Sequence, residues 1–294
     1  MSVLKKILAI FITAIDLFAV VVLDFPSVLN GTPLDRAAFT AEPVWADEFD
    51  GTELDTTKWK DHHTSKEAGL NVTTIRRGGY WNPQMAQVAD GNLTIRTEYL
   101  EEGLGGGPAG YYTCGLDTNG LFEKAHGYFE IRCKLPKGQG HWAAFWMLND
   151  GMSNVDGSGR DGAEIDIFES PYYKFKSDRF RNAVTSNVHI DGYGDDHEYR
   201  NVNKTTVPGD PYEEFHTYGL LWTENSYSFY IDGIRAGVST FGGASMAPEF
   251  MLISVEVGGE NAVPGDSWSG DIRKNDILPS EFVIDYVRVY DLVK

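Results

Sequence analysis

The sequence predicts an all-β protein in which two curved antiparallel sheets pack face to face and one sheet forms a concave groove. Short runs of alternating apolar and polar residues recur along the chain, and this repeat of two residues is that of a β-strand. Aromatic residues make up 13% of the chain, a composition that favours strands. Turn-forming Asp-Gly pairs separate the runs at positions 50–51, 90–91, 191–192 and 232–233. The sequence contains no long amphipathic helical pattern that would compete with this prediction.

The first thirty residues show the pattern of an export signal. Lys5 and Lys6 precede an apolar stretch, residues 7–23, in which Asp16 is the one charged residue. We expect residues 1–30 to be a signal peptide or, if uncleaved, an N-terminal membrane anchor, and residues 31–43 to be a linker. Residues 44–294 would then form a single domain of a secreted or cell-surface protein.

The net charge restricts the classes of binding partner, and the two cysteines allow a disulfide or free thiols. The chain contains 25 basic and 43 acidic residues, so its net charge is −18. Such a surface repels phosphate groups, which argues against nucleic acid and anionic membranes as partners. Cys114 and Cys133 fit no metal-binding spacing, and they could form a disulfide or remain two buried thiols. We expect a monomer.

Four segments with a period of two define strands most clearly. They cover residues 91–99, 127–135, 226–233 and 282–291. In the last segment, Ile284 and Tyr286 are expected on one face and Asp285 and Val287 on the other. This pattern suits a strand that is covered on both sides.

The segment "GAEIDIFES", residues 162–170, places three carboxylates in an otherwise apolar strand. Alternation puts Glu164 and Asp166 on one face, but Glu169 is five positions after Glu164 and would point away in a regular strand. One extra residue in a β-bulge, at Ile167 or Phe168, would bring Glu169 to the same face. The spacing therefore predicts a bulge that collects three carboxylates.

Three interpretations of this group are open from the spacing alone. Retaining glycoside hydrolases need two carboxyl groups about 5–5.5 Å apart, and a third can orient the nucleophile. A Ca²⁺ site also gathers oxygen ligands, and an edge strand can simply expose charge to solvent. The apolar residues Ile165, Ile167 and Phe168 require a covered opposite face, which argues against a calcium-binding loop.

The surrounding sequence resembles glycoside hydrolase family 16, the family of laminarinases, lichenases and agarases. The likeness is carried by "WADEFDGTELDTTKW", "DGNLTI", "HGYFEIRCKLPKGQGHWAAFWMLND", "DGAEIDIFES", "NVHIDGYG", "FHTYGLLWTENSYSFYIDG" and "FVIDYVRVY", and it covers nearly everything after residue 44. The resemblance implies a β-jelly roll and a retaining mechanism. It also implies Glu164 as nucleophile, Asp166 as its supporting carboxylate and Glu169 as acid/base, with no cofactor for catalysis.

Aromatic residues are expected to hold the sugar, because an aromatic ring can cover the apolar face of a sugar ring. Trp142 and Trp146 flank "AAF" with the parity to share a face, although Trp146 could be a core residue. The resemblance also implies that His189 lies close to the acid/base and contacts the substrate. Tyr80 and Trp81 lie in a Gly-rich segment that we interpret as a loop contacting more distant sugars.

The same resemblance suggests a structural calcium ion, held by Glu48, the Gly91 carbonyl and Asp285, although ordinary turns would also explain the Asp-Gly pairs there. Two departures weaken the assignment to β-1,3-glucan. The segment Cys114-Gly115-Leu116 lacks an arginine that is common in laminarinases, and Glu256 occupies a position where an amide or a small residue is more usual. We expect a polysaccharide substrate, either a β-1,3- or mixed β-1,3/1,4-glucan or, as the alternative, a β-galactan. A non-catalytic carbohydrate-binding sandwich remains a third interpretation.

Overall fold

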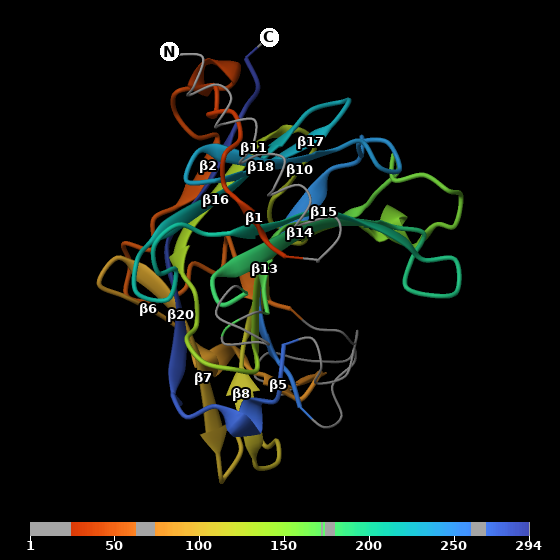
Figure 1. Ribbon diagram of the computed structural model, residues 1–294. Helices are drawn as coiled ribbons and strands as arrows, with labels where there is room; N and C mark the ends of the chain where they lie inside the picture. The colour runs from red at the N-terminus through yellow and green to blue at the C-terminus, as the bar shows by residue number, and fades with distance from the viewer. Residues whose placement is uncertain (1–24, 63–73, 172, 174–179, 260–268, 294) are drawn as a thin grey trace.

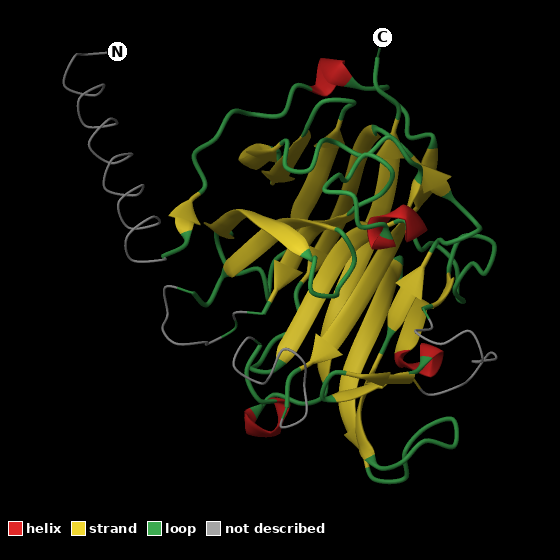
Figure 2. Ribbon diagram, turned by 90° about the vertical axis from the view of Figure 1, so that its right-hand side faces the viewer, coloured by secondary structure: helices red, strands yellow, loops and turns green. Residues whose placement is uncertain are grey.

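The computed structural model describes residues 25–62, 74–171, 173, 180–259 and 269–293, which form two β-sheets packed against each other (Figure 1). The expected all-β sandwich is therefore confirmed. Within these ranges the helical elements are short 3-10 turns at the periphery (Figure 2, red), namely η1 Arg36–Ala38, η2 Pro83–Met85, η3 Asp150–Ser153 and η4 Ile272–Lys274. No helix in the described part of the chain is long and apolar enough to cross a membrane.

The first sheet contains nine strands and carries the functional cleft described below. Its order is β1 (Ser27–Val28), β15 (Glu198–Thr206), β14 (Ala183–Ile190), β13 (Glu164–Ser170), β12 (His141–Leu148), β19 (Glu249–Val257), β9 (Gly115–Asp117) and β3 (Lys60–Asp61), with β10 (Glu123–Lys124) beside β19. The strands pair antiparallel except that β1 runs parallel to β15. Strands β13, β14 and β15 consequently lie side by side (Figure 1).

The second sheet contains eleven strands. Its order is β18 (Ile234–Ser239), β17 (Tyr227–Ile231), β16 (His216–Trp222), β11 (Gly127–Lys134), β20 (Ser280–Tyr290), β7 (Asn92–Leu100), β8 (Gly110–Thr113), β5 (Gly79–Trp81) and β4 (Thr74–Arg76), with β2 (Trp45–Asp47) beside β20 and β6 (Ala86–Ala89) beside β7. The four clearest predicted strands correspond to β7, β11, β17 and β20. Of these, β11, β20 and β7 are adjacent at the centre of this sheet, and β17 lies next to the edge strand β18.

The core lies between the two sheets and is rich in aromatic residues. Phe168 of β13 packs against Tyr218 of β16 with ring centroids 4.3 Å apart, so the strand that carries the carboxylates is anchored on its opposite face. Cys114 and Cys133 are both buried, free thiols. Of the two alternatives for the cysteines, the structure has the unbridged one.

Strand β20 contains a bulge that the sequence pattern did not predict. Arg132 pairs with Tyr286 and Cys133 pairs with Ile284, so Asp285 is the extra residue. The bulge turns Val287 into the core and leaves Tyr286 on the outer face. The expectation that Ile284 and Tyr286 share a face is therefore wrong, because strict alternation cannot anticipate an inserted residue.

The sequence analysis expected residues 31–43 to be a linker, and this expectation is wrong. Phe39 is 4% exposed and stacks on Tyr128 of the second sheet at a centroid distance of 4.6 Å. Leu34 donates its backbone N–H to the Gly233 carbonyl at 2.7 Å. The segment covers an aromatic outer face of the second sheet that would otherwise be exposed to water. The expected export segment lies mostly in residues 1–24, outside the described residues.

Candidate active site

The three carboxylates of β13 reach one face through a β-bulge. On the β12 side, Asp166 pairs with Trp146 and Phe168 pairs with Phe145, so Ile167 is the extra residue between them. The pairing with β14 shifts over the same interval, between Asp166 and Glu169. The predicted bulge is confirmed at one of the two positions expected for it.

Glu164, Asp166 and Glu169 line a single cleft of about 600 Å³ on the first sheet. The apolar residues between them point the other way, and Ile165 and Phe168 are 0% and 1% exposed within the core. The strand therefore separates its side chains as the sequence predicted, with carboxylates facing the cleft and apolar groups facing the second sheet.

Each glutamate is held by hydrogen-bond donors. The indole N–H of Trp142 donates to Oε1 of Glu169 at 2.8 Å, and the amide of Asn187 donates to its Oε2. The hydroxyl of Tyr193 donates to Oε2 of Glu164. These contacts restrict the rotamers of both carboxyl groups, which is a requirement for a catalytic pair.

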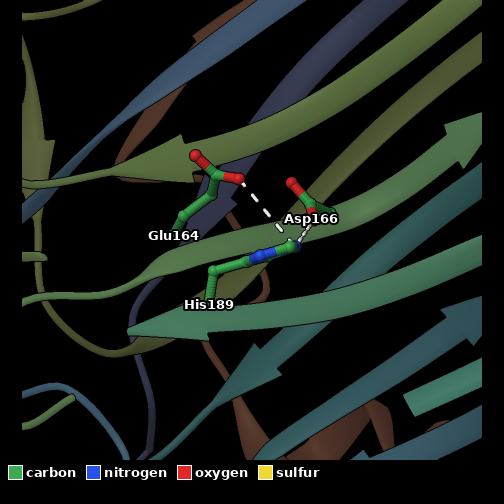
Figure 3. A group of neighbouring side chains, drawn as sticks. All are labelled: Glu164, Asp166 and His189. Atoms are coloured by element: carbon green, nitrogen blue, oxygen red, sulfur yellow. Dashed lines mark ion pairs between the residues drawn. The ribbon is translucent and has the colours of Figure 1, made fainter. Parts of the chain in front are cut away.

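His189 lies on β14 directly opposite Glu164. Its Nε2 is 3.2 Å from Oδ2 of Asp166 and 3.9 Å from Oε1 of Glu164 (Figure 3). Its Nδ1 is 2.9 Å from Nε2 of His197, and the two rings stack nearly parallel. His189 thus contacts the carboxylates from the side, whereas the sequence had suggested a residue that contacts sugar.

The crowding of carboxylates has a strong effect on their proton affinity. Burial and the neighbouring Asp166 raise the pKa of Glu164 to about 7. Burial likewise raises the pKa of Asp166 to about 7. Burial, and then the charges of Asp166 and Glu164, raise the pKa of Glu169 well above its usual range. Glu169 is therefore suited to hold a proton under conditions in which Glu164 can ionise.

Both tryptophans predicted to face the sugar line the cleft. Trp142 and Trp146 belong to β12, and Ala144 between them also lines the cleft. The indole N–H of Trp146 donates to Oγ of Ser254 at 3.0 Å. The two rings are partly exposed, so they are available for stacking on a ligand.

A cluster of two arginines and one glutamate lies on the β19 side of β12, whereas the three carboxylates lie on its β13 side. Glu256 of β19 pairs across strands with Trp142 and accepts hydrogen bonds from Arg76 and, at 2.5 Å, from Nε of Arg77. The Arg77 guanidinium carbon lies 4.7 Å from the centroid of Trp142. This Arg76/Arg77/Glu256 cluster lines the cleft and includes Glu256, which the sequence analysis named as a departure from laminarinases.

The expectation that Tyr80 and Trp81 lie on an exposed loop is wrong. Both residues belong to β5, and Trp81 is 2% exposed with its N–H donated to the Val255 carbonyl at 2.7 Å. Tyr80 is half-buried against Tyr112, with ring centroids 5.1 Å apart. Neither side chain lines the cleft. Trp81 instead supports Arg76, whose guanidinium carbon lies 4.5 Å from the ring centroid.

The residues proposed to hold calcium do not fit such a site. Both oxygens of Glu48 accept hydrogen bonds from Arg288, at 2.8 and 2.7 Å, and Asp285 is paired with Arg132. Gly91 lies in the turn between β6 and β7 with φ of +72°. Guanidinium groups beside both carboxylates would repel a Ca²⁺ ion, which requires six to eight oxygen ligands.

Sequence reasoning missed Tyr193, Asn187, Arg76 and His62. Tyr193 follows the Asp191-Gly192 turn, and an aromatic residue in a Gly-rich loop after the His189 strand was an available signal. Asn187 precedes His189 by two residues and therefore has the parity to face the same carboxylates. Arg76 and His62 gave no comparable signal, because their approach to the cleft depends on tertiary packing.

The comparisons with known proteins agree with this geometry. A model of the beta-porphyranase A-D GH16 domain matches residues 39–292. The chain is 28% identical over 287 residues to a beta-glucanase of Rhodothermus marinus, covering 91% of each protein. It is 27% identical over 283 residues to glucan endo-1,3-beta-glucosidase A1 of Niallia circulans, covering 88% of this chain but spanning 39% of that protein's length.

A solved structure shares the fold. The catalytic domain of an endo-1,3-beta-glucanase (laminarinase) from Thermotoga petrophila superposes with a TM-score of 0.65 at 26% identity, covering 87% of this chain and 100% of that chain. The jelly-roll architecture expected from the sequence is thereby confirmed. Because the family model matches most of the chain, including the bulged strand with its three carboxylates, this protein belongs to glycoside hydrolase family 16.

Proposed function

We propose that this protein is a retaining endo-glycosidase that cleaves internal β-linkages of a polysaccharide by double displacement. The observation that carries the proposal is the group of three carboxylates on one cleft face, each with its pKa raised chiefly by burial. A retaining glycosidase needs one carboxyl group that holds a proton and a second that attacks the sugar. Cleavage at internal linkages is supported by the similarity to an endo-1,3-beta-glucanase and to a glucan endo-1,3-beta-glucosidase.

The family resemblance assigns the roles, and the raised pKa of Glu169 agrees with its part. Glu169, whose pKa burial raises well above its usual range, donates its proton to the glycosidic oxygen as the bond breaks. Glu164 attacks the anomeric carbon and forms a glycosyl ester. Glu169 then removes a proton from a water molecule, which hydrolyses the ester. Asp166, between them, keeps its carboxylate near both groups and raises the pKa of each. This chemistry needs no cofactor.

The favoured substrate is a β-1,3-glucan or a mixed β-1,3/1,4-glucan. The glucanases of Rhodothermus marinus and Niallia circulans and the laminarinase of Thermotoga petrophila support this choice. Trp142 and Trp146 would stack on successive sugar rings of such a chain. A substrate of this kind also fits an exported protein, and we propose that the enzyme acts outside the cell as a monomer.

A β-galactan is the second candidate. Two observations favour it: the family model is that of beta-porphyranases, and the cleft holds the Arg76/Arg77/Glu256 cluster where the sequence departs from laminarinases. Guanidinium groups beside a tryptophan are suited to polar or anionic sugar substituents as well as to hydroxyl groups.

Assaying the release of reducing ends from laminarin, lichenan, agarose and porphyran tests these proposals together. Activity on laminarin or lichenan is expected, with oligosaccharide products typical of endo cleavage. Silence on both glucans beside activity on a galactan would reverse the order of the two substrates. NMR of the first product should show retention of the β-anomer, and an inverted product would contradict the double displacement.

The remaining alternative is a carbohydrate-binding sandwich without turnover, and one variant distinguishes it from a hydrolase. Glu164→Gln should bind the preferred polysaccharide but lose hydrolysis, whereas a binding protein would show equal silence in wild type and variant across the same panel. Elongation of added acceptor oligosaccharides would reveal transglycosylation by the same ester intermediate.

A further inference from the structure

Three side chains of the kinds that bind metal ions converge where Glu164 and Asp166 line the cleft. Glu164, Asp166 and His189 each offer one ligand atom, and these atoms lie within 4.8 Å of one another; the contacts to Nε2 of His189 come from Oε1 of Glu164 and Oδ2 of Asp166 (Figure 3). Within the described ranges, this is the one group of three or more such side chains. It arises because Glu164 and Asp166 share the cleft face of β13 while His189 is the cross-strand partner of Glu164 on β14.

Glu164 and His189 each use their other polar atom in a hydrogen bond, and the three converging atoms face one another. Oε2 of Glu164 accepts from the Tyr193 hydroxyl, and Nδ1 of His189 is hydrogen-bonded to His197. Asp166 is 4% exposed, and its Oδ2 makes no hydrogen bond among the described residues, although the ring nitrogen Nε2 of His189 lies 3.2 Å away as an ion-pair partner. A buried carboxylate oxygen in this state indicates that a further group belongs beside it.

The second interaction of His189 is typical of a metal ligand. Histidines that bind metals commonly use their other ring nitrogen in a hydrogen bond, which fixes the tautomer and the orientation of the ring. The bond from His189 Nδ1 to His197, together with the parallel stacking of the two rings, has this effect here. Nε2 of His189 is thereby directed at the two carboxylates.

The geometry and donor types favour zinc. Ligand bonds of about 2.0–2.1 Å in a tetrahedral site place neighbouring ligand atoms about 3.3 Å apart. The separation between His189 Nε2 and Asp166 Oδ2 is 3.2 Å, and that to Glu164 Oε1 is 3.9 Å, which a small side-chain shift closes. One imidazole with two carboxylates suits Zn²⁺, whereas Ca²⁺ and Mg²⁺ prefer oxygen ligands alone.

We propose that Zn²⁺ binds to Glu164, Asp166 and His189, with its fourth position open toward the cleft. The ion occupies the carboxylate oxygens that the proposed reaction uses, so it blocks hydrolysis reversibly and competes with the polysaccharide. The inhibition rests on the proposed function, but the binding of the metal does not. The site would make the enzyme sensitive to free zinc in its surroundings.

Isothermal titration of the full chain with zinc chloride, after removal of metals by chelator, tests the site without any substrate. We expect binding of Zn²⁺ that excess Ca²⁺ or Mg²⁺ does not prevent. His189→Gln should weaken it at least about tenfold, and His197→Gln should weaken it less, as expected for an outer partner of a ligand. His126→Gln is the matched control, because His126 lies outside the cleft and contacts the Ser245 carbonyl. It should bind Zn²⁺ as the wild type does.

The outcomes separate cleanly. Weakened binding in His189→Gln beside unchanged binding in His126→Gln supports the site. Absence of binding to the wild type, or equal binding by the wild type and His189→Gln, would overturn it. If zinc binds at these residues and no polysaccharide is hydrolysed under any condition, the zinc site stands and the proposed hydrolytic function fails.

Discussion

Buried carboxylates on the two sides of β12 lie in opposite surroundings. On the β19 side, Glu256 is 5% exposed and its oxygens are bound by Arg76 and Arg77. On the β13 side, three carboxylates lie beside one another, and His189 is the basic side chain in contact with them. A carboxylate between two arginines is a fixed anion that can shape the binding surface. Carboxylates beside each other hold protons that can be transferred, which is what acid/base chemistry requires.

The largest expected effect is a difference in kcat between variants of the carboxylates on the β13 side of β12 and a variant of Glu256 on the β19 side. Glu164→Gln and Glu169→Gln should each lower kcat by about 10⁴-fold, because each removes a group that the reacting atoms need. Glu256→Gln keeps the shape of a residue that touches no reacting atom, so its kcat should stay within about tenfold of wild type. Rates on the preferred polysaccharide check this, with melting temperatures as the control for folding. A loss in Glu256→Gln as large as that in Glu164→Gln would remove the distinction.

The second effect concerns stability. Glu256→Ala leaves the Arg76 and Arg77 guanidinium groups partly buried without their partner, and it should lower the free energy of unfolding by about 2–3 kcal/mol. Urea unfolding measures the change. The control is Glu224→Ala, which alters an exposed glutamate in a turn and should change the free energy by less than about 0.5 kcal/mol. Equal values for the two variants would show that the arginine pairs contribute little.

A smaller effect appears in the pH dependence of stability. Because burial raises the pKa of Glu164 and Asp166 to about 7, the folded chain retains protons that the unfolded chain releases at lower pH. These groups therefore favour folding at low pH, and that contribution is lost as the pH rises through about 7. Glu164→Gln should reduce the fall in unfolding free energy between pH 5 and 8 by up to about 3 kcal/mol. Unfolding curves at both pH values test this, and an unchanged difference would contradict it.

The smallest predicted effects are shifts of the pH–rate profile. Tyr193→Phe and Trp142→Phe each remove a donor that favours the ionised form of its glutamate. The acidic limb of kcat/KM, set by Glu164, should move to higher pH in Tyr193→Phe. The alkaline limb, set by Glu169, should move upward in Trp142→Phe, each by less than about one pH unit. Movement of the opposite limb in either variant would exchange the roles of the two glutamates.

The sequence was most informative where an irregularity of the strand changed the spacing of charged and apolar residues. Three carboxylates among apolar residues at spacings of two and three required an inserted residue, and the structure has it at Ile167. The bulge at Asp285 left no such trace, because apolar and polar residues both suit the outer face of β20. Phe39 and Trp81 were misplaced for a different reason. Their burial depends on surfaces of distant strands that local patterns do not describe.

The central claim is that Glu164 forms a covalent bond to the sugar. Mass spectrometry of the enzyme after treatment with 2-deoxy-2-fluoro oligosaccharide substrates, in both glucosyl and galactosyl series, tests it directly. One of the two series should leave a single glycosyl group on the peptide that contains Glu164, and Glu164→Gln should remain unlabelled. A label on Glu169, or a fully active enzyme that is labelled by neither series, would contradict the account.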